Sequence, residues 1–305
     1  MDTKRIKFAY VAYHFPPIAG GLSLRSAQFC RYLPDFDVNL EVFTTALGTK
    51  SIYLDPTSLE PYSDLLKIHR CSDFYSSKWV SALGDYSDVL RYLVRGFSFP
   101  DIHRGWAKRV FLDIEKSHAL SPFDGIFTTS FPWSSHLVGL WAKRHLNLSW
   151  VSDFRDPWSN NYDLKAKLTL PYHRWLEQAV YTQSDHVIFN TESHRLSTLN
   201  DFDLPPFKTS FIPNGFDPEI LNIIKPANYP DTKLRIGYLG GLRGDPFEGP
   251  FYRALASLRE LNRELFESIE VNFIGVSEVK GSLAEKLSLK SNFVFHGFLP
   301  ELLAA

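Results

Sequence analysis

Charged residues that could do chemistry stand directly after an apolar segment in "SDFRDPW" (152–158). Asp153, Arg155 and Asp156 lie close together there. Such a compact group of two carboxylates and a guanidinium could act on a bound ligand. The same residues could equally form a structural ion pair, in which Arg155 holds a loop and Asp156 or Ser159 caps a helix.

A second polar segment, "SFPWSSH" (130–136), follows the apolar run 125–129. In an open parallel sheet the carboxyl ends of the strands share one edge, and ligands bind there. The two polar segments are therefore expected to meet at that edge. The cleft that we predict is lined by Ser130, Trp133, His136, Asp153 and Arg155.

Glycine-rich turns occupy further positions of the same kind. "HFPPIAGG" (14–21) leads from an apolar run into a helical pattern, and the first N–H groups of a helix have no partner inside it. Gly20 and Gly21 would let the backbone approach a ligand, although the spacing is not the G-x-G-x-x-G of a dinucleotide site. The other candidates for donor or acceptor binding are Asn214 in "IPNGFD" and Gly240, Gly241 and Arg243 in "YLGGLRG".

Missing patterns exclude several classes of protein. The sequence has no Walker A sequence, no G-x-S-x-G and no H-E-x-x-H or Cys/His ligand spacing, so P-loop, acyl-transfer and metal chemistry are not expected. The net charge of -1 offers no cationic surface for nucleic acid. With two cysteines and no apolar leader or membrane-spanning run, the protein is expected to be cytoplasmic with reduced thiols.

Apolar runs alternate with helical periodicity along the whole chain. This alternation predicts an α/β fold of repeated βα units around parallel sheets. The first series has predicted strands at 6–13, 40–44, 125–129, 149–152, 186–190 and 209–212, and predicted helices at 23–33, 134–145, 167–183 and 192–199. Residues 49–122, with helical pieces near 80–94 and 106–117, are interpreted as an insertion.

A polar, proline-containing stretch separates this series from a second one. We predict an N-terminal domain over 1–222, a linker over 223–233 and a C-terminal domain over 234–305. The second series has strands in "LRIGYLGG", "IEVNFIG" and "NFVFHGF" and a helix in "FYRALASLRELNREL". This set is smaller than an independent domain usually has, so the second domain is expected to be incomplete.

The stretch 91–111 combines basic and aromatic residues. Five cations stand there against the single acid Asp101. One interpretation is a patch that makes peripheral contact with an anionic membrane, with Phe97, Phe99 and Trp106 entering the interface. The other is a solvated helix face whose aromatic residues point inward.

Taken together, these segments resemble bacterial glycosyltransferases of the GT-B fold in the retaining family 4. The opening loop is similar to the family's P-x-x-GG segment, and "IPNGFD" to its frequent I-P-N-G-V-D. "SDFRDPW" resembles the D-x-R-D-x-W of members that build cell-surface polysaccharides. "VIFNTESHRLSTL", "RIGYLGGL" and "FVFHGFLP" match further segments in the family's order, so the resemblance covers almost the whole chain.

The resemblance implies two Rossmann-like, doubly wound domains, an N-terminal one for the acceptor and a C-terminal one for the nucleotide-sugar. It implies transfer from a UDP- or GDP-linked sugar to a lipid-linked or polysaccharide acceptor, with retention of anomeric configuration and without a cofactor or metal. Asp153, Arg155 and Asp156 match residues placed against the sugar, and Gly20 and Gly21 match the loop near the donor phosphates. The resemblance also implies that the protein acts at the inner face of the plasma membrane.

One family segment has no counterpart in this sequence. Members carry an E-x7-E after the G-x-x-P strand, whose acids hold the donor's sugar and ribose, whereas this sequence ends at "FLPELLAA". The 305-residue form is therefore expected to bind a nucleotide-sugar poorly. The alternatives are an active glycosyltransferase, a truncated or degenerate non-catalytic member that binds acceptor or a partner, and another GT-B enzyme such as a sugar-nucleotide epimerase.

Overall fold

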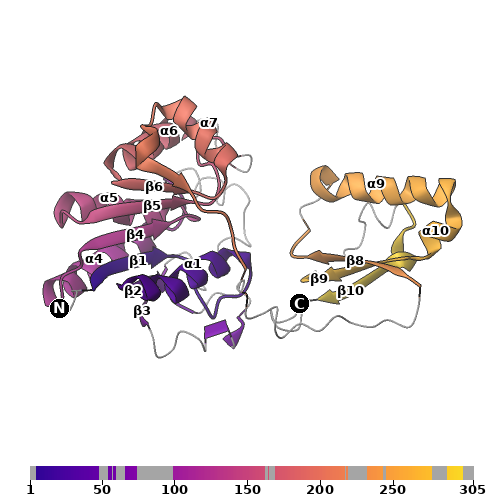
Figure 1. Cartoon of the computed structure of the whole chain (residues 1–305), viewed down its shortest axis with the longest axis horizontal. Coiled ribbons are helices and arrows are strands. Elements are labelled where there is room, and N and C mark those ends of the chain that lie inside the picture. The colour runs from indigo at the N-terminus through magenta and orange to yellow at the C-terminus, as the bar shows by residue number, and fades with distance from the viewer. Residues whose placement is uncertain are drawn as a thin grey trace, which may run out of the picture. The chain divides into compact units, whose positions relative to one another are not determined.

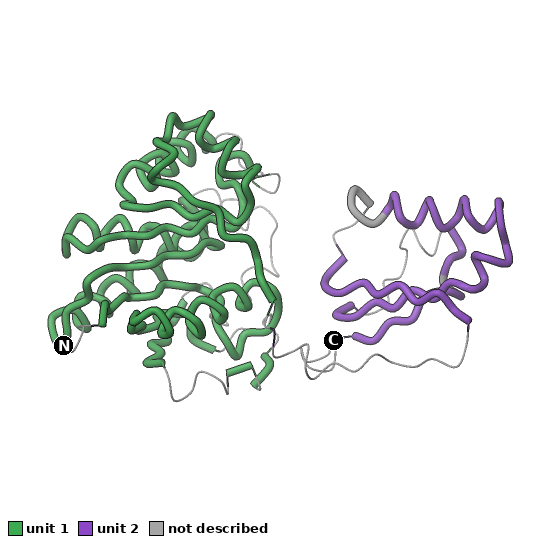
Figure 2. The backbone as a smooth tube through the Cα atoms, viewed as in Figure 1, with its two compact units in different colours: residues 1–216 green, residues 217–305 purple. Residues whose placement is uncertain are grey.

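The computed structural model describes residues 5–47, 54–56, 58–59, 66–73, 99–161, 164, 169–216, 218, 232–242, 245–276 and 287–297. The chain divides into two compact units, residues 1–216 and residues 217–305 (Figure 2). Each unit has its own parallel sheet and its own buried apolar cluster. None of the described helices has the length and apolar character that crossing a membrane requires.

A parallel sheet of seven strands, in the order β3-β2-β1-β4-β5-β6-β7, lies at the centre of unit 1 (Figure 1). Its strands are β1 Ile6–Ala12, β2 Val38–Thr45, β3 Lys67–Cys71, β4 Gly125–Thr129, β5 Ser149–Phe154, β6 His186–Phe189 and β7 Thr209–Phe211. β1 pairs with both β2 and β4, so the chain builds outward to β3, returns past β1 and continues to β7. This reversal creates a switch point at the carboxyl ends of β1 and β4, where open α/β sheets bind ligands.

Helices cover both faces of this sheet. They are α1 Gly21–Tyr32, η1 Leu33–Phe36, α4 Arg104–Leu120, α5 Ser134–His145, α6 Leu170–Gln183, α7 Glu192–Phe202 and η4 Pro206–Lys208. Ala9 and Val11 of β1 belong to the cluster that includes α4 and α5, whereas Tyr10 and Ala12 belong to the cluster that includes α1. Because successive residues of a strand face opposite sides, the sheet is buried on both faces and is doubly wound, as the sequence predicts.

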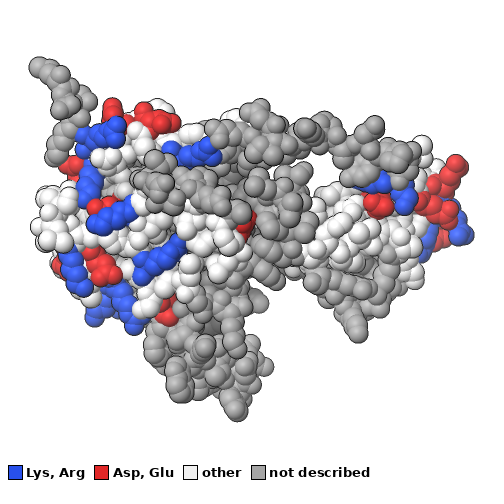
Figure 3. Space-filling model, turned by 90° about the horizontal axis from the view of Figure 1, so that it is seen from below, with Lys and Arg blue, Asp and Glu red and all other residues white. Residues whose placement is uncertain are grey.

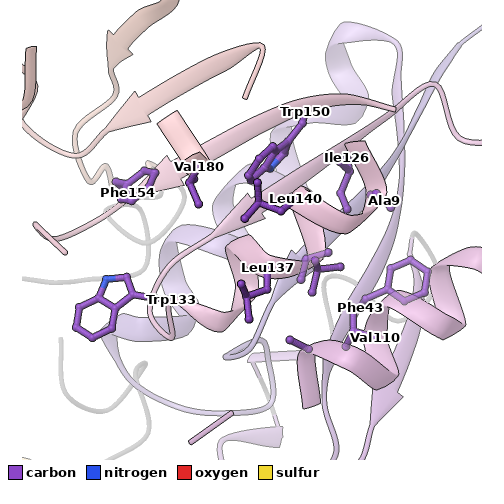
Figure 4. Close-up of a cluster of buried hydrophobic side chains, with 14 of the residues drawn as sticks. Ala9, Phe43, Val110, Ile126, Trp133, Leu137, Leu140, Trp150, Phe154 and Val180 are labelled. Atoms are coloured by element: carbon purple, nitrogen blue, oxygen red, sulfur yellow. The ribbon is translucent and has the colours of Figure 1, made fainter. Parts of the chain in front are cut away.

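The helices on one face approach the sheet closely (Figure 4). Trp150 of β5 is fully buried, and its Nε1 donates a hydrogen bond to Oγ1 of Thr128 at 2.9 Å. The indole lies under α5 at Gly139, where an added Cβ atom would come within 2.1 Å of it. The absence of a side chain at this glycine therefore sets how closely α5 packs on the sheet.

The interpretation of residues 49–122 as an insertion is wrong for its described part. β3 pairs in parallel with β2 at the edge of the sheet, and α4 contributes Trp106, Val110 and Ile114 to the core. "KIHRC" carries mainly polar residues and is half-buried, so it lacks the apolar run that marks the central strands. The helical piece predicted near 80–94 lies outside the described residues.

The described part of unit 2 has a smaller parallel sheet in the order β10-β9-β8. Its elements are β8 Leu234–Leu239, α9 Asp245–Leu261, α10 Arg263–Glu267, β9 Ile269–Ile274, η5 Lys290–Asn292 and β10 Phe293–Gly297. Val271 and Phe273 of β9 are buried against Tyr252 and Leu255 of α9. The strands and the long helix expected from the second apolar series are thus present.

Candidate functional site

The centre of the candidate site is an enclosed ion pair at the carboxyl edge of the unit 1 sheet. Asp153, near the end of β5, has no exposed surface. Arg25 of α1 donates from Nη2 to Oδ1 of Asp153 at 2.7 Å and from Nε to both carboxylate oxygens. Thr129, at the end of β4, donates to Oδ2 at 2.7 Å. A buried charge is costly unless it is paired and hydrogen-bonded, and this carboxylate has both kinds of partner.

Arg155 extends this network toward the first turns of α1. Its Nε donates to Oγ1 of Thr129 at 3.1 Å, and its Nη2 donates to Oγ of Ser26 at 2.7 Å. Its Nη1 donates to the carbonyl oxygen of Leu22. The guanidinium therefore fixes the start of α1 to the end of β5, while Asp156, the next residue along the chain, is exposed.

The turn before α1 is open to ligands. Gly20 is the N-cap residue with a φ of 99°, which favours glycine, and no side chain caps the helix. No atom lies within 4 Å of the Cβ positions of Gly20 or Gly21, and both residues are exposed. α1 has no acidic residue in its first turn. The backbone donors of this turn and the two nearby guanidinium groups of Arg25 and Arg155 together favour an anionic group.

The segment after β4 is largely enclosed. Ser130 is buried, and its N–H donates to the carbonyl oxygen of Asp153 at 3.0 Å. Trp133 stacks on Trp158 with ring centroids 5.8 Å apart and is 8% exposed. The structure thus brings Ser130 and Asp153 together as predicted, but mainly through backbone contacts inside the protein.

His136 lies in the core. It is fully buried, stacks on Phe154 at 4.3 Å and shares a hydrogen bond with Oγ1 of Thr128 at 2.9 Å through Nδ1. Burial lowers the pKa of its imidazole to about 3, so the ring is neutral at physiological pH. The structure therefore places this residue in the core and not in the lining of a cleft, and its ring packs between α5 and β5.

The end of "SDFRDPW" and the residue that follows it are anchored by α6. Trp158 donates from Nε1 to Nδ1 of His173 at 3.0 Å. The N–H of Ser159 donates to Oε2 of Glu177 at 3.0 Å, and the hydroxyl of Tyr181 donates to Oε1 at 2.8 Å. Burial raises the pKa of Glu177. No local sequence pattern predicts the role of these α6 residues, because the residues that they contact in this segment are distant in the chain.

Arg25 is the principal site residue that the sequence analysis does not identify. Besides Asp153, its Nη1 donates to Oδ1 of Asn190 at 3.5 Å and to Oδ1 of Asn214 at 3.4 Å. Arg25 therefore links β5, the residue after β6 and the segment after β7, and Asn214 lies beside this network. The sequence could have pointed to Arg25 through its position on the inward face of a predicted helix, because a buried arginine needs hydrogen-bond or charge partners.

A groove of about 460 Å³ lies beside Arg25 on unit 1. Its lining is mostly apolar and comes from α1, η1 and the segment 212–216. Tyr32, Phe36 and Phe216 contribute exposed aromatic surface to it. The groove can therefore accept an apolar group next to the polar network.

In unit 2 the corresponding turn follows β8. Gly240 has a φ of 118°, and no atom lies within 4 Å of a Cβ at Gly240 or Gly241. Arg243 lies outside the described residues. Within the described ranges, no group of three or more His, Cys, Asp or Glu side chains could hold a metal ion.

The basic-aromatic stretch is described from residue 99 onward. Trp106 is fully buried, and Phe99 packs edge-on against His173 at 4.8 Å. These two aromatic residues point into the protein, as the structural interpretation expects. Over the face of unit 1 in Figure 3, basic and acidic side chains are interspersed on the described surface.

The chain is similar to known proteins. The chain matches the family model described as Glycosyltransferase Family 4 over residues 19–220, more than half of its length. A D-inositol 3-phosphate glycosyltransferase from Stackebrandtia nassauensis is 24% identical over 294 residues, which cover 88% of this chain and 59% of that protein. The chain thus spans less than two thirds of this curated relative.

Solved structures share the architecture. Sucrose-phosphate synthase from Thermosynechococcus elongatus has a TM-score of 0.66 and 16% identity, covering 98% of this chain and 72% of the synthase. A trehalose-6-phosphate protein from E. coli, bound with UDP-2-fluoro glucose, has a TM-score of 0.57 and 13% identity, covering 97% of this chain and 75% of that chain. The fold is GT-B, and with the family match the chain belongs to glycosyltransferase family 4.

Proposed function

We propose that this protein transfers a sugar from a UDP- or GDP-linked donor to a lipid-linked or polysaccharide acceptor, with retention of anomeric configuration. The observation that carries the proposal is the Arg25–Asp153–Arg155 network, which fixes the open Gly20–Gly21 turn at the carboxyl edge of the sheet. The family match supports a transferase, and the UDP-2-fluoro glucose bound to the E. coli structure supports a nucleotide-sugar donor.

The charges of this network suit the departure of a diphosphate. When the bond between the anomeric carbon and the phosphate oxygen breaks, negative charge grows on the leaving group. Arg25 and Arg155 place two guanidinium groups near the start of α1. Arg25 is paired with the enclosed carboxylate of Asp153, and Thr129 links Arg155 to the same carboxylate. The remaining positive charge, together with the helix N-terminus, would stabilise that leaving group.

The lipid-linked acceptor draws support from the groove between α1 and 212–216. Its mostly apolar lining would take a hydrocarbon portion, while Arg25 and Asn214 offer polar atoms at the same place. Peripheral contact with the inner face of the plasma membrane is part of the proposal, carried by the exposed cations Arg104, Lys108 and Arg109. The buried Trp106 takes no part in it.

Donor binding and turnover test this proposal directly. Calorimetry with UDP-glucose and GDP-mannose should detect binding, which is expected to be weak for this 305-residue form, and release of nucleoside diphosphate should follow turnover. Gly20→Ala is expected to lower the release rate by about tenfold to 100-fold, because a Cβ strains the turn at a φ of 99° and displaces its backbone. Gly105→Ala, on the exposed surface of α4 with no atom within 4 Å, is the control.

The product gives a second readout. NMR of the anomeric proton should show the configuration of the donor retained in the product. Inversion would contradict the retaining mechanism. Failure to bind either donor would instead favour the non-catalytic alternative, a family member that binds acceptor or a partner.

A further inference from the structure

The groove beside Arg25 follows α1 along the whole length of this helix. Gly21, Arg25, Gln28 and Tyr32 are three or four residues apart and all line the groove, so one stripe of α1 forms its wall. The lining continues into η1 as far as Phe36. Because each residue of an α-helix adds about 1.5 Å, α1 alone extends about 16 Å between its two ends. The groove is therefore elongated and runs parallel to α1.

The two ends of this groove differ in polarity. Toward the start of α1, Arg25 is the one charged residue among the described residues of the lining, and its Nη1 donates to Oδ1 of Asn214 at 3.4 Å. Gln28 lines the groove one turn further along. The α1 and η1 residues of the lining beyond Gln28 are Phe29, Tyr32, Leu33 and Phe36. The Arg25 end thus carries most of the polar atoms, whereas the Phe36 end is apolar and aromatic.

The apolar end leaves large hydrophobic side chains in contact with water. Phe36 is 76% exposed and Tyr32 is 37% exposed. Phe216, from the segment that completes the lining, is 70% exposed. Removing apolar surface from water is favourable in proportion to its area, and exposed aromatic residues gathered in one concave site mark a place where an apolar group binds.

The polar end of the groove adjoins the place proposed for the donor phosphates. Gly21 lines the groove and also belongs to the open turn before α1. A ligand whose apolar part extends toward Phe36 therefore presents its polar end at that turn. Arg25 takes part both in the lining and in the network with Asp153, so only a short polar head fits between the apolar part and the reacting hydroxyl.

We propose that the groove binds the hydrocarbon chain of an acceptor lipid with a small polar head, and that the chain extends along α1 from Arg25 toward Phe36. The inference rests on the proposed function and favours a lipid-linked acceptor over a polysaccharide. Beyond Gln28 the described lining from α1 and η1 offers sugar hydroxyl groups only the hydroxyl of Tyr32, so a glycan there would lose hydrogen bonds to water without replacing them. Tyr32 and Phe36 are then the residues that select for chain length.

Alkyl glucosides of increasing chain length test this assignment. Methyl, butyl and octyl glucoside are compared as acceptors for the full chain, with UDP-glucose and GDP-mannose as donors and below the concentration at which the octyl compound forms micelles. Each CH₂ group buried in the groove should raise kcat/KM by about threefold to fourfold, so the octyl compound should exceed the butyl compound by at least about tenfold. Maltoheptaose, a soluble glycan, should be a poorer acceptor than octyl glucoside. Calorimetry with the same glucosides measures their binding separately from turnover.

Phe36→Ser is the main variant, because it removes an aromatic ring from the apolar end. Its side chain is largely exposed, so the fold should be kept, and the gain from butyl to octyl glucoside should fall below about threefold. Phe216→Ser tests the other part of the lining in the same way. Phe207→Ser is the matched control, because Phe207 on η4 is 87% exposed and is not among the residues that line the groove. This variant should keep the full dependence on chain length.

The outcomes separate this inference from the proposed function. Equal kcat/KM values for the three glucosides, or a preference for maltoheptaose, would overturn the inference alone. An equal weakening of the chain-length dependence in Phe36→Ser and Phe207→Ser would also overturn it, because the chain then binds elsewhere. An affinity that rises with chain length and falls in Phe36→Ser, without release of nucleoside diphosphate, would overturn the proposed function and support the groove as a lipid-binding site.

Discussion

At the scale of single residues, Asp153 combines full burial with three strong hydrogen-bond donors. In Asp153→Ala, the guanidinium of Arg25, itself only 6% exposed, would remain buried without its counter-charge. We expect unit 1 to lose about 3–5 kcal/mol of stability, as measured by urea unfolding. All seven tryptophans of the sequence precede residue 217, so tryptophan fluorescence follows this unit alone.

Lys116→Ala is the control for that measurement. Lys116 pairs with Asp113 at 3.4 Å, but its side chain is 76% exposed, so its removal should cost less than about 1 kcal/mol. A loss of similar size in Asp153→Ala would show that the enclosed pair does not hold α1 to β5. Replacing Arg25 and Asp153 together by apolar residues should recover part of the stability, because no charge is then left unpaired.

A second residue-scale prediction concerns pH. The pKa of His136 is lowered to about 3 by burial, against about 6.5 in an unfolded chain. Between these values the unfolded state binds more protons, so this histidine makes stability fall as pH falls and contributes no loss above pH 7. Relative to His136→Gln, the wild type should lose about 2 kcal/mol between pH 7 and pH 5. A difference that does not vary with pH would contradict the buried neutral state.

At the scale of elements, the approach of α5 to β5 depends on Gly139. A Cβ atom there would lie 2.1 to 2.4 Å from atoms of the Trp150 indole, so helix or ring must shift. We expect Gly139→Ala to destabilise unit 1 by about 1–3 kcal/mol in urea unfolding. Gly105→Ala, on the exposed start of α4, meets no atom within 4 Å and should be neutral or stabilise by up to about 1 kcal/mol. Equal effects in the two variants would show that α5 can move freely.

The elements also show what the sequence could predict. β1, β4 and β6 are buried on both faces and read as apolar runs, so they were predictable. β3 was missed because an edge strand needs fewer apolar residues. The turn glycines were found because a positive φ at Gly20 and Gly240 restricts the residue type.

The partners within the site could not be found in the same way. Arg25 and Asp153 are 128 residues apart, so only the strand order brings them together. Local patterns encode no such pairing. His136 shows the converse, because a histidine at a helix start looks the same in sequence whether its face is exposed or, as here, buried.

At the scale of the whole molecule, each unit has its own buried core, because the clusters around Trp150 and Phe273 draw on one unit each. Among the described residues unit 2 has the smaller sheet, and Leu234 and Leu239 of β8 are 54% and 71% exposed. Less apolar burial means less stability, so unit 2 should unfold first.

Two probes can separate these transitions in urea. Far-UV circular dichroism reports both units, whereas tryptophan fluorescence reports residues 1–216 alone. We expect the dichroism signal to begin to fall at a lower urea concentration than the fluorescence, because two units with separate cores do not unfold in one step. A chain of residues 1–216 should keep the fluorescence midpoint of the full protein. Coincident transitions, or a lower midpoint for the shorter chain, would mean that unit 1 depends on unit 2 for its stability.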